Sequence, residues 1–183
     1  MYSRTSEPVQ FQRDCDVVMI PSGDAVNMPE GTMGYITQAL GGSFTVFIEG
    51  NLFRVAGLDA DAINKDVVQP PSLPEDATDA DVEALVTKQI KTCYDPEIPV
   101  DLLELGLIYQ KTISSIGENK RKVYVQMTLT APGCGMGDIL VDDVRSKILL
   151  IPTIEEVQVD LVFDPPWTQD MMSDVAKLET GML

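Results

Sequence analysis

The stretch Val123-Tyr124-Val125-Gln126-Met127-Thr128-Leu129-Thr130-Ala131-Pro132-Gly133-Cys134-Gly135-Met136-Gly137 decides how the second half of this chain folds. Apolar residues occupy every second position from Val123 to Leu129, a pattern that predicts a β-strand with one buried face. The glycines that follow Pro132 predict a tight turn. From Asp138 to Leu150 the apolar residues recur at helical spacing, so we expect a helix directly after the turn.

Cys134 lies in this turn, between the expected strand and the expected helix. The unpaired N–H groups and the positive dipole end of a helix start favour an ionised thiol. The alternative is a small, unreactive cysteine, which is common in proteins. Gly133 and Gly135 only relieve backbone strain in that case. The turn lacks the Lys-Ser/Thr ending of a phosphate-binding loop, so nucleotide binding is not expected.

Working outward, the residues from 79 to 183 predict a helix-strand-strand-helix-strand unit of the α+β class. Thr78 is the expected N-cap of the first helix, whose apolar stripe ends at Cys93. The first strand is expected over 107–113. The last strand carries Val157, Val159, Leu161 and Phe163 and ends at a pair of prolines.

The residues from 1 to 68 predict a separate small β-rich, barrel-like module, because short apolar runs alternate with Gly-containing turns. A proline-rich linker is expected over 69–78. Cys15 in the first module stands near Arg13, which would activate its thiol weakly. A partly buried strand residue is the favoured interpretation. The expected strands of this module are 16–20, 31–40, 43–48 and 52–56.

The composition indicates a packed globular protein, with 183 residues of which 44% are apolar and 23% charged. A net charge of −16 argues against binding nucleic acid or anionic lipid through a basic surface. No apolar run is long enough to span a membrane, and the N-terminus has no signal core. We therefore expect a cytoplasmic protein.

Histidine is absent from the chain, which excludes a Ser-His-Asp or Cys-His couple and any His-ligated metal. Conventional hydrolase chemistry is therefore not expected, and we predict that the protein is not an enzyme. The three cysteines are widely and unequally spaced, so a disulfide framework is not expected either.

Three loops carry unusual residues: Asp95-Pro96-Glu97, the Cys134 turn and Asp164-Pro165-Pro166-Trp167. If they meet at one end of the sheet, Cys134 lies near the carboxylates of Asp95, Glu97 and Asp164. Such a group would be a mixed metal site or a thiol with a proton acceptor. In the alternative, the aspartates cap their own turns and Trp167 fills the core.

Four motifs follow one another in the second half of the chain: Cys93-Tyr94-Asp95-Pro96-Glu97-Ile98-Pro99-Val100, Leu105-Gly106-Leu107-Ile108-Tyr109, Thr130-Ala131-Pro132-Gly133-Cys134 and Asp164-Pro165-Pro166-Trp167. In this order they resemble the PaaD-like metal–sulfur cluster biosynthesis family. Through residues 20–23, 37–46, 50–52 and 59–62, the first module resembles the N-terminal extension of the SufT branch of that family.

The resemblance implies an accessory role in iron–sulfur protein maturation, with assembly machinery and client apoproteins as partners. The family's reactive cysteine maps onto Cys134 and its acidic motif onto Asp95 and Glu97. Gly135 stands where the family often has proline, which would loosen the turn. The supporting residues are Asp95, Glu97, Thr130, Gly133, Gly135, Asp164 and Trp167.

Three functions stay open at this point. A cluster normally takes four cysteine-type ligands, so a carrier would hold a transient iron–sulfur cluster or iron through Cys134 with outside thiols or a second copy in a homodimer. An adaptor would link clients to the assembly machinery without any cluster. A redox protein would oxidise Cys134 to a sulfenic acid or a mixed disulfide.

Overall fold

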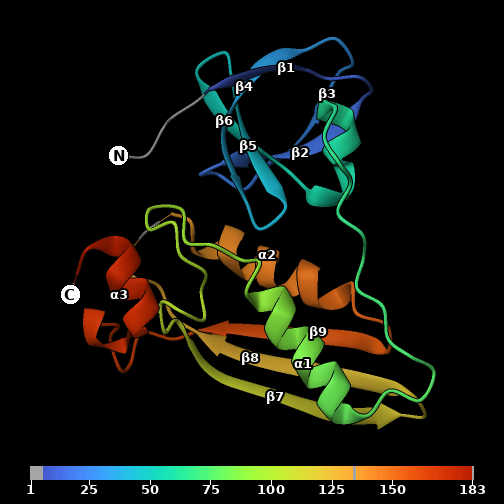
Figure 1. The fold of residues 1–183 in the computed structure, drawn as a ribbon, viewed down its shortest axis with the longest axis vertical. Helices are drawn as coiled ribbons and strands as arrows, with labels where there is room; N and C mark the ends of the chain where they lie inside the picture. Colours follow the sequence, from blue (N-terminus) through green and yellow to red (C-terminus); the bar gives the residue numbers. More distant parts are fainter. Residues whose placement is uncertain (1–5, 134, 183) are drawn as a thin grey trace. The chain divides into compact units, whose positions relative to one another are not determined.

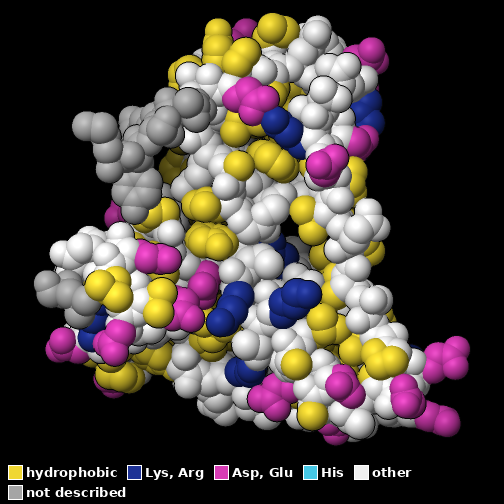
Figure 2. Space-filling view, viewed as in Figure 1, with side chains coloured by type: hydrophobic (Ala, Val, Ile, Leu, Met, Phe, Trp, Pro, Cys, Tyr) yellow, Lys and Arg dark blue, Asp and Glu magenta, His cyan; other side chains and the backbone are white. Residues whose placement is uncertain are grey.

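The computed structural model describes residues 6–133 and 135–182, and Cys134 therefore lies outside the described residues. The chain divides into two compact units, Met1–Gln69 and Pro70–Leu183 (Figure 1). Acidic side chains lie on the surface of both units, as the net charge of −16 requires (Figure 2). Each unit has its own hydrophobic core.

The N-terminal unit is one antiparallel sheet of six short strands, in the order β1-β4-β5-β6-β2-β3. The expected β-rich module is therefore confirmed. Two four-residue strands, β1 and β3, were not predicted, and they occupy the two edges of the sheet. The strands are β1 (Glu7–Gln10), β2 (Cys15–Ile20), β3 (Ala25–Met28), β4 (Met33–Leu40), β5 (Ser43–Ile48) and β6 (Asn51–Val55).

Cys15 opens β2 and is a core residue, with only 2% of its surface exposed. Burial, followed by the nearby Asp59 carboxylate, raises the pKa of the Cys15 thiol. Arg13 acts in the opposite direction but is outweighed, so the Cys15 thiol is not activated, and the favoured interpretation of a strand residue is confirmed, with Cys15 more fully buried than expected. Arg13 instead donates Nε to Asp61 Oδ2 at 2.8 Å and Nη2 to Asp59 Oδ1 at 2.9 Å. These bonds fix the turn after β1 to the 3-10 segment η1 (Gly57–Ile63).

The raised pKa of Cys15 predicts a pH dependence of stability. The protonated thiol stabilises the fold fully below the unfolded-state pKa of about 8.5. This contribution to stability is lost as the pH rises through the higher pKa that the thiol has in the folded protein. We expect the free energy of unfolding to fall from pH 8 to about pH 10, and Cys15→Ala to remove that part of the fall. Urea unfolding followed by circular dichroism checks this; identical pH profiles for both proteins would contradict it.

The C-terminal unit has the expected order of helix, strand, strand, helix and strand, followed by a short helix that was not predicted. Strand β8 is antiparallel to β7 and parallel to β9, and the helices α1 and α2 cover one face of the sheet (Figure 1). The elements are α1 (Asp79–Ile90), β7 (Ile108–Gly117), β8 (Lys120–Met127), α2 (Gly137–Leu149), β9 (Ile154–Leu161), η2 (Gln169–Met171) and α3 (Asp174–Thr180).

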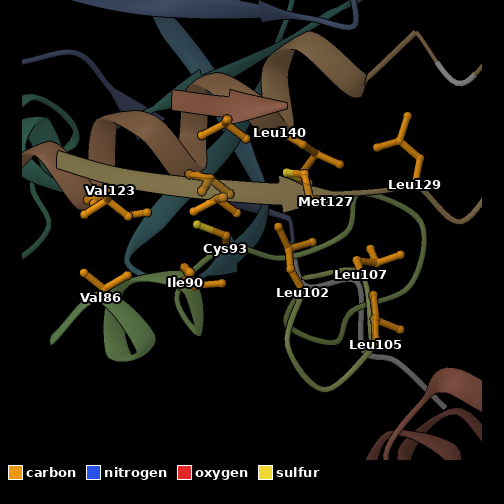
Figure 3. Packing of buried hydrophobic residues seen from close by; sticks show 14 of the residues in the cluster. Val86, Ile90, Cys93, Leu102, Leu105, Leu107, Val123, Met127, Leu129 and Leu140 are labelled. Carbon is orange, nitrogen blue, oxygen red and sulfur yellow. The ribbon is translucent and has the colours of Figure 1, made fainter. Parts of the chain in front are cut away.

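Thr78 caps α1 as predicted. Its hydroxyl accepts the N–H of Asp81, and the Asp81 carboxylate accepts the N–H of Thr78 at 2.7 Å. Together these bonds form a capping box. Helix α1 buries a face that includes Ile90, and Cys93 follows it into the core beside Ile90 and Met127 (Figure 3). Cys93 is therefore a packing residue.

The last strand ends earlier than predicted. Strand β9 stops at Leu161, and Phe163 is 47% exposed rather than part of the buried face. The prolines at 165 and 166 have no N–H for a sheet ladder, so the chain leaves the sheet before them. Among the residues that the structure describes, no helix has the length and apolarity to cross a membrane.

Candidate functional site

The sheet topology places three chain segments at the same end of the strands. Met127 at the end of β8 pairs with Ile108 at the start of β7 and with Leu161 at the end of β9. The chain therefore leaves the sheet at this end through 128–136 after β8 and through 162–168 after β9. It enters the sheet at the same end through 102–107, which leads into β7. The sequence did not predict that β8 and β9 run parallel. This direction decides which loops are neighbours.

Asp95 is a buried carboxylate that joins two of the predicted loops. Only 3% of the residue is exposed. Its Oδ1 accepts the backbone N–H groups of Glu97 and Ile98, both at 2.9 Å. Its Oδ2 accepts the hydroxyl of Thr130 at 3.4 Å. Asp95 therefore caps its own turn and also holds the segment that leads to Cys134, whereas the Glu97 side chain is exposed.

A second aspartate, which the sequence analysis missed, repeats this turn. Asp101 Oδ1 accepts the N–H groups of Leu103 and Glu104, both at 3.0 Å. An aspartate that bonds its own backbone two residues on is a known turn pattern, so the signal was present in the sequence. The residues in and after this turn include three buried leucines that fill this end of the core: Leu102, Leu105 and Leu107.

Gly106, in the motif that runs from Leu105 to Tyr109, lies where two backbone segments approach closely. Its φ is +72°, and a Cβ atom there would lie 2.2 Å from the carbonyl oxygen of Met171. Only glycine fits such a contact without a shift of the backbone. The segment after Leu105 is therefore packed directly against the C-terminal segment.

Trp167 and Tyr109 hold the segment that follows β9. Trp167 is half-buried against the core and donates Nε1 to the carbonyl of Leu105 at 2.7 Å. Tyr109 donates its hydroxyl to the carbonyl of Pro165 at 2.8 Å. Asp164 is exposed. The tryptophan thus has the core-filling position that was weighed as the alternative.

The Trp167 contact predicts a measurable loss of stability. Trp167→Phe keeps an aromatic ring but leaves the carbonyl of the buried Leu105 without its donor. We expect the free energy of unfolding to fall by about 1 kcal/mol. Tyr109→Phe is the matched control, since its hydroxyl bond is exposed and should contribute less. Urea unfolding measures both, and equal stability of Trp167→Phe and wild type would contradict the prediction.

The Cys134 turn lies between exposed neighbours. Gly133 and Gly135 are both exposed, and Gly133 has a left-handed φ of +79°. Helix α2 begins at Gly137, and its N-cap residue, Met136, gives no side-chain hydrogen bond. Among the residues that the structure describes, no N-cap side chain accepts the first N–H groups of the helix. The exposure and ionisation of the Cys134 thiol itself lie outside the described residues.

The three predicted carboxylates do not form a metal site by themselves. Among residues 6–133 and 135–182, no three acidic or cysteine side chains are grouped so that they could hold a metal ion. The carboxylate oxygens of Asp95 accept hydrogen bonds from backbone N–H groups and from a hydroxyl, so in this structure they serve as hydrogen-bond acceptors. Thr128 is a further buried residue at this end of the strands, and its hydroxyl has no partner in the described part of the chain.

Comparisons with known proteins find relatives of part of this chain. A family profile described as "Iron-sulfur cluster assembly protein" matches residues 83–161, which include β7, β8, α2 and β9. A crystal structure of a domain of unknown function, DUF59, from Bacillus anthracis is 34% identical. It covers 56% of this chain and 93% of that chain, with a TM-score of 0.48.

Two curated relatives each match about half of the chain. The "Fe-S protein maturation auxiliary factor" of Porphyromonas gingivalis is 44% identical over 98 residues, 54% of this chain and 90% of the relative. The "Fe-S protein maturation auxiliary factor SufT" of Staphylococcus aureus is 41% identical over 88 residues, 48% of this chain and 96% of the relative. The chain therefore belongs to the family of iron–sulfur cluster assembly proteins that includes these maturation auxiliary factors.

Proposed function

We propose that this protein is an accessory factor in iron–sulfur protein maturation that helps transfer or target clusters to apoproteins through Cys134. One observation carries the proposal. Cys15 and Cys93 are buried in the cores of the two units, with 2% and 0% exposure. This leaves Cys134, in a turn with exposed glycines on both sides, as the thiol for a partner to reach.

The cluster is the cargo in this proposal. One thiol supplies one of the four ligands that a cluster normally takes. The remaining ligands come from the partner that gives or receives the cluster, or from a second copy of the chain. Binding is therefore brief, and the assembly machinery and the client apoproteins are the partners.

The residues around Cys134 position the thiol and the partner. Asp95 and Thr130 hold the start of the turn, while Gly133 and Gly135 give it its shape. Trp167 fixes the neighbouring segment, and the exposed carboxylates of Glu97 and Asp164 lie where a partner would contact them.

We assign the maturation role to residues 79–183 and treat 1–68 as a separate module joined by the linker 69–78. No catalytic residue is part of the proposal, because the chain moves a preformed group and lacks histidine. We place the role in the cytoplasm, where cysteines stay reduced.

A cluster-free adaptor is the second candidate. It would bind the scaffold or client through its acidic surface, which includes the exposed carboxylates of Glu97 and Asp164, without a cluster on this chain. A thiol redox role is less favoured, since Cys15 and Cys93 are buried and are therefore not exposed as resolving thiols.

Cluster transfer to apo-ferredoxin tests the proposal. Under anaerobic conditions a cluster-loaded scaffold protein is mixed with apo-ferredoxin, and the visible absorbance of the holo-ferredoxin is followed. We expect this protein, in catalytic amounts, to speed the transfer. If it instead captures the scaffold in a pull-down without iron and leaves the transfer rate unchanged, the adaptor role replaces the carrier role.

A further inference from the structure

Helix α3 is held firmly against the C-terminal unit by one side. Ser173 caps it by accepting the N–H of Ala176 at 3.1 Å, and the Ser173 N–H donates to the carbonyl of Glu104 at 2.8 Å. Met172 and Ala176 are buried in the core, with 3% and 0% exposure. Because one side of α3 is held in the core, the opposite side of the helix faces solvent.

The solvent side of α3 carries large apolar side chains. Val175 is 56% exposed and Leu178 is 65% exposed. Residues three apart in a helix lie on one face, so the two form a continuous apolar strip. Met182, 41% exposed, follows the C-cap residue Gly181. The strip is not turned inward, because Ala176 already occupies the core side.

Carboxylates border this strip on both sides. Asp174 lies four residues before Leu178, and Glu179 lies four residues after Val175, so each stacks beside one apolar residue. Figure 2 shows yellow and magenta side chains together over α3. Neither carboxylate forms an ion pair with any residue that the structure describes.

Two acidic residues on β9 differ from these carboxylates because each has a cationic partner. Glu155 and Glu156 at β9 pair with Lys120 and Lys122, both at 3.5 Å. On β9 the lysines of the same chain neutralise the carboxylates. On α3 the two carboxylates have no such partner among the described residues and lie beside exposed apolar side chains. A surface of this kind fits a partner that brings both apolar groups and cations.

We propose that the face of α3 formed by Val175 and Leu178, bordered by Asp174 and Glu179, docks an amphipathic helical segment of a partner protein whose apolar face is bordered by Lys or Arg. This inference names the chemistry of a partner and takes its biological meaning from the proposed maturation role. Its test uses neither Cys134 nor a cluster, so its failure leaves that role standing.

The probe is a fluorescently labelled synthetic peptide of about 14 residues, long enough to form a helix once bound, with Leu and Lys in a helical pattern. Its binding to the full chain is followed by fluorescence anisotropy. We expect micromolar affinity. The double variant Val175→Ser/Leu178→Ser should weaken it at least about tenfold, through the loss of two apolar contacts. Asp174→Asn/Glu179→Gln should weaken it about threefold and reduce its salt dependence.

Two matched controls separate docking from general attraction. Glu155→Gln/Glu156→Gln removes the same charge from β9, and Leu52→Ser removes an exposed apolar residue from the N-terminal unit. Both should leave the affinity within about twofold, because neither change touches the residues of the proposed docking face. A peptide of the same composition with its Leu and Lys positions scrambled should bind more weakly.

The proposal is overturned if the wild type does not bind the patterned peptide. It is also overturned if both charge variants weaken binding equally, because that result indicates a non-specific attraction of an acidic chain for a cation. Amide chemical shifts of the wild type provide a readout that needs no variant. On peptide addition, the largest shifts should fall in α3, and shifts elsewhere alone would contradict the docking site.

Discussion

Replacing Cys134 with alanine is expected to reduce cluster transfer to the rate measured without the protein. The reason is that the other two cysteines are buried in separate cores and give a cluster no alternative thiol. The change should leave the fold intact, because the residues beside Cys134 in the turn are exposed. We expect the free energy of unfolding to change by less than about 0.5 kcal/mol, as for most surface substitutions.

The measurement is the anaerobic transfer assay with apo-ferredoxin, combined with urea unfolding of the same variant. Cys15→Ala is the matched control, since it removes one thiol from a core and should keep the transfer rate. A Cys134→Ala protein that folds normally and transfers clusters as fast as the wild type would remove Cys134 from the mechanism.

Replacing Asp95 with alanine is expected to damage both stability and transfer. The carboxylate is 3% exposed, and its loss leaves the N–H groups of Glu97 and Ile98 without an acceptor. We expect the free energy of unfolding to fall by about 2 to 3 kcal/mol. Transfer should fall as well, because the bond from Thr130 no longer holds the segment before Cys134.

Two further variants show which bond matters. Asp95→Asn keeps an oxygen that accepts both backbone N–H groups, so it should recover most of the stability. Glu97→Gln changes an exposed neighbour in the same motif and should alter the free energy of unfolding by less than about 0.5 kcal/mol. If Asp95→Ala were as stable and as active as Glu97→Gln, Asp95 would have no positioning role.

Most of the regular structure followed from local patterns in the sequence. The apolar stripe and Thr78 predicted α1, and alternation predicted β8, because both signals lie within a few residues. The edge strands β1 and β3 were missed because each has only four residues, too few for a clear alternation, and β1 forms only through pairing with the more distant β4. Helix α3 is seven residues long, too short for a clear period, although Ser173 marks its start.

The candidate site was only partly predictable, since its contacts join residues far apart in the chain. That Asp95 and Trp167 have structural roles follows from turn chemistry and ring size. The bond from Thr130 to Asp95 spans 35 positions, and no local pattern reports it. The extension of the last strand to Phe163 was wrong because periodicity continued past the point where the prolines end the sheet.

The central claim is that Cys134 is an accessible thiol that ionises more easily than an ordinary cysteine. Alkylation of the native protein across a pH series, with each cysteine followed by mass spectrometry, tests it most directly. We predict that Cys134 reacts quickly with a midpoint below about pH 8.5, while Cys15 and Cys93 react only after unfolding. A Cys134 that reacts as slowly as these two buried thiols, or has its midpoint at or above that pH, would contradict the account.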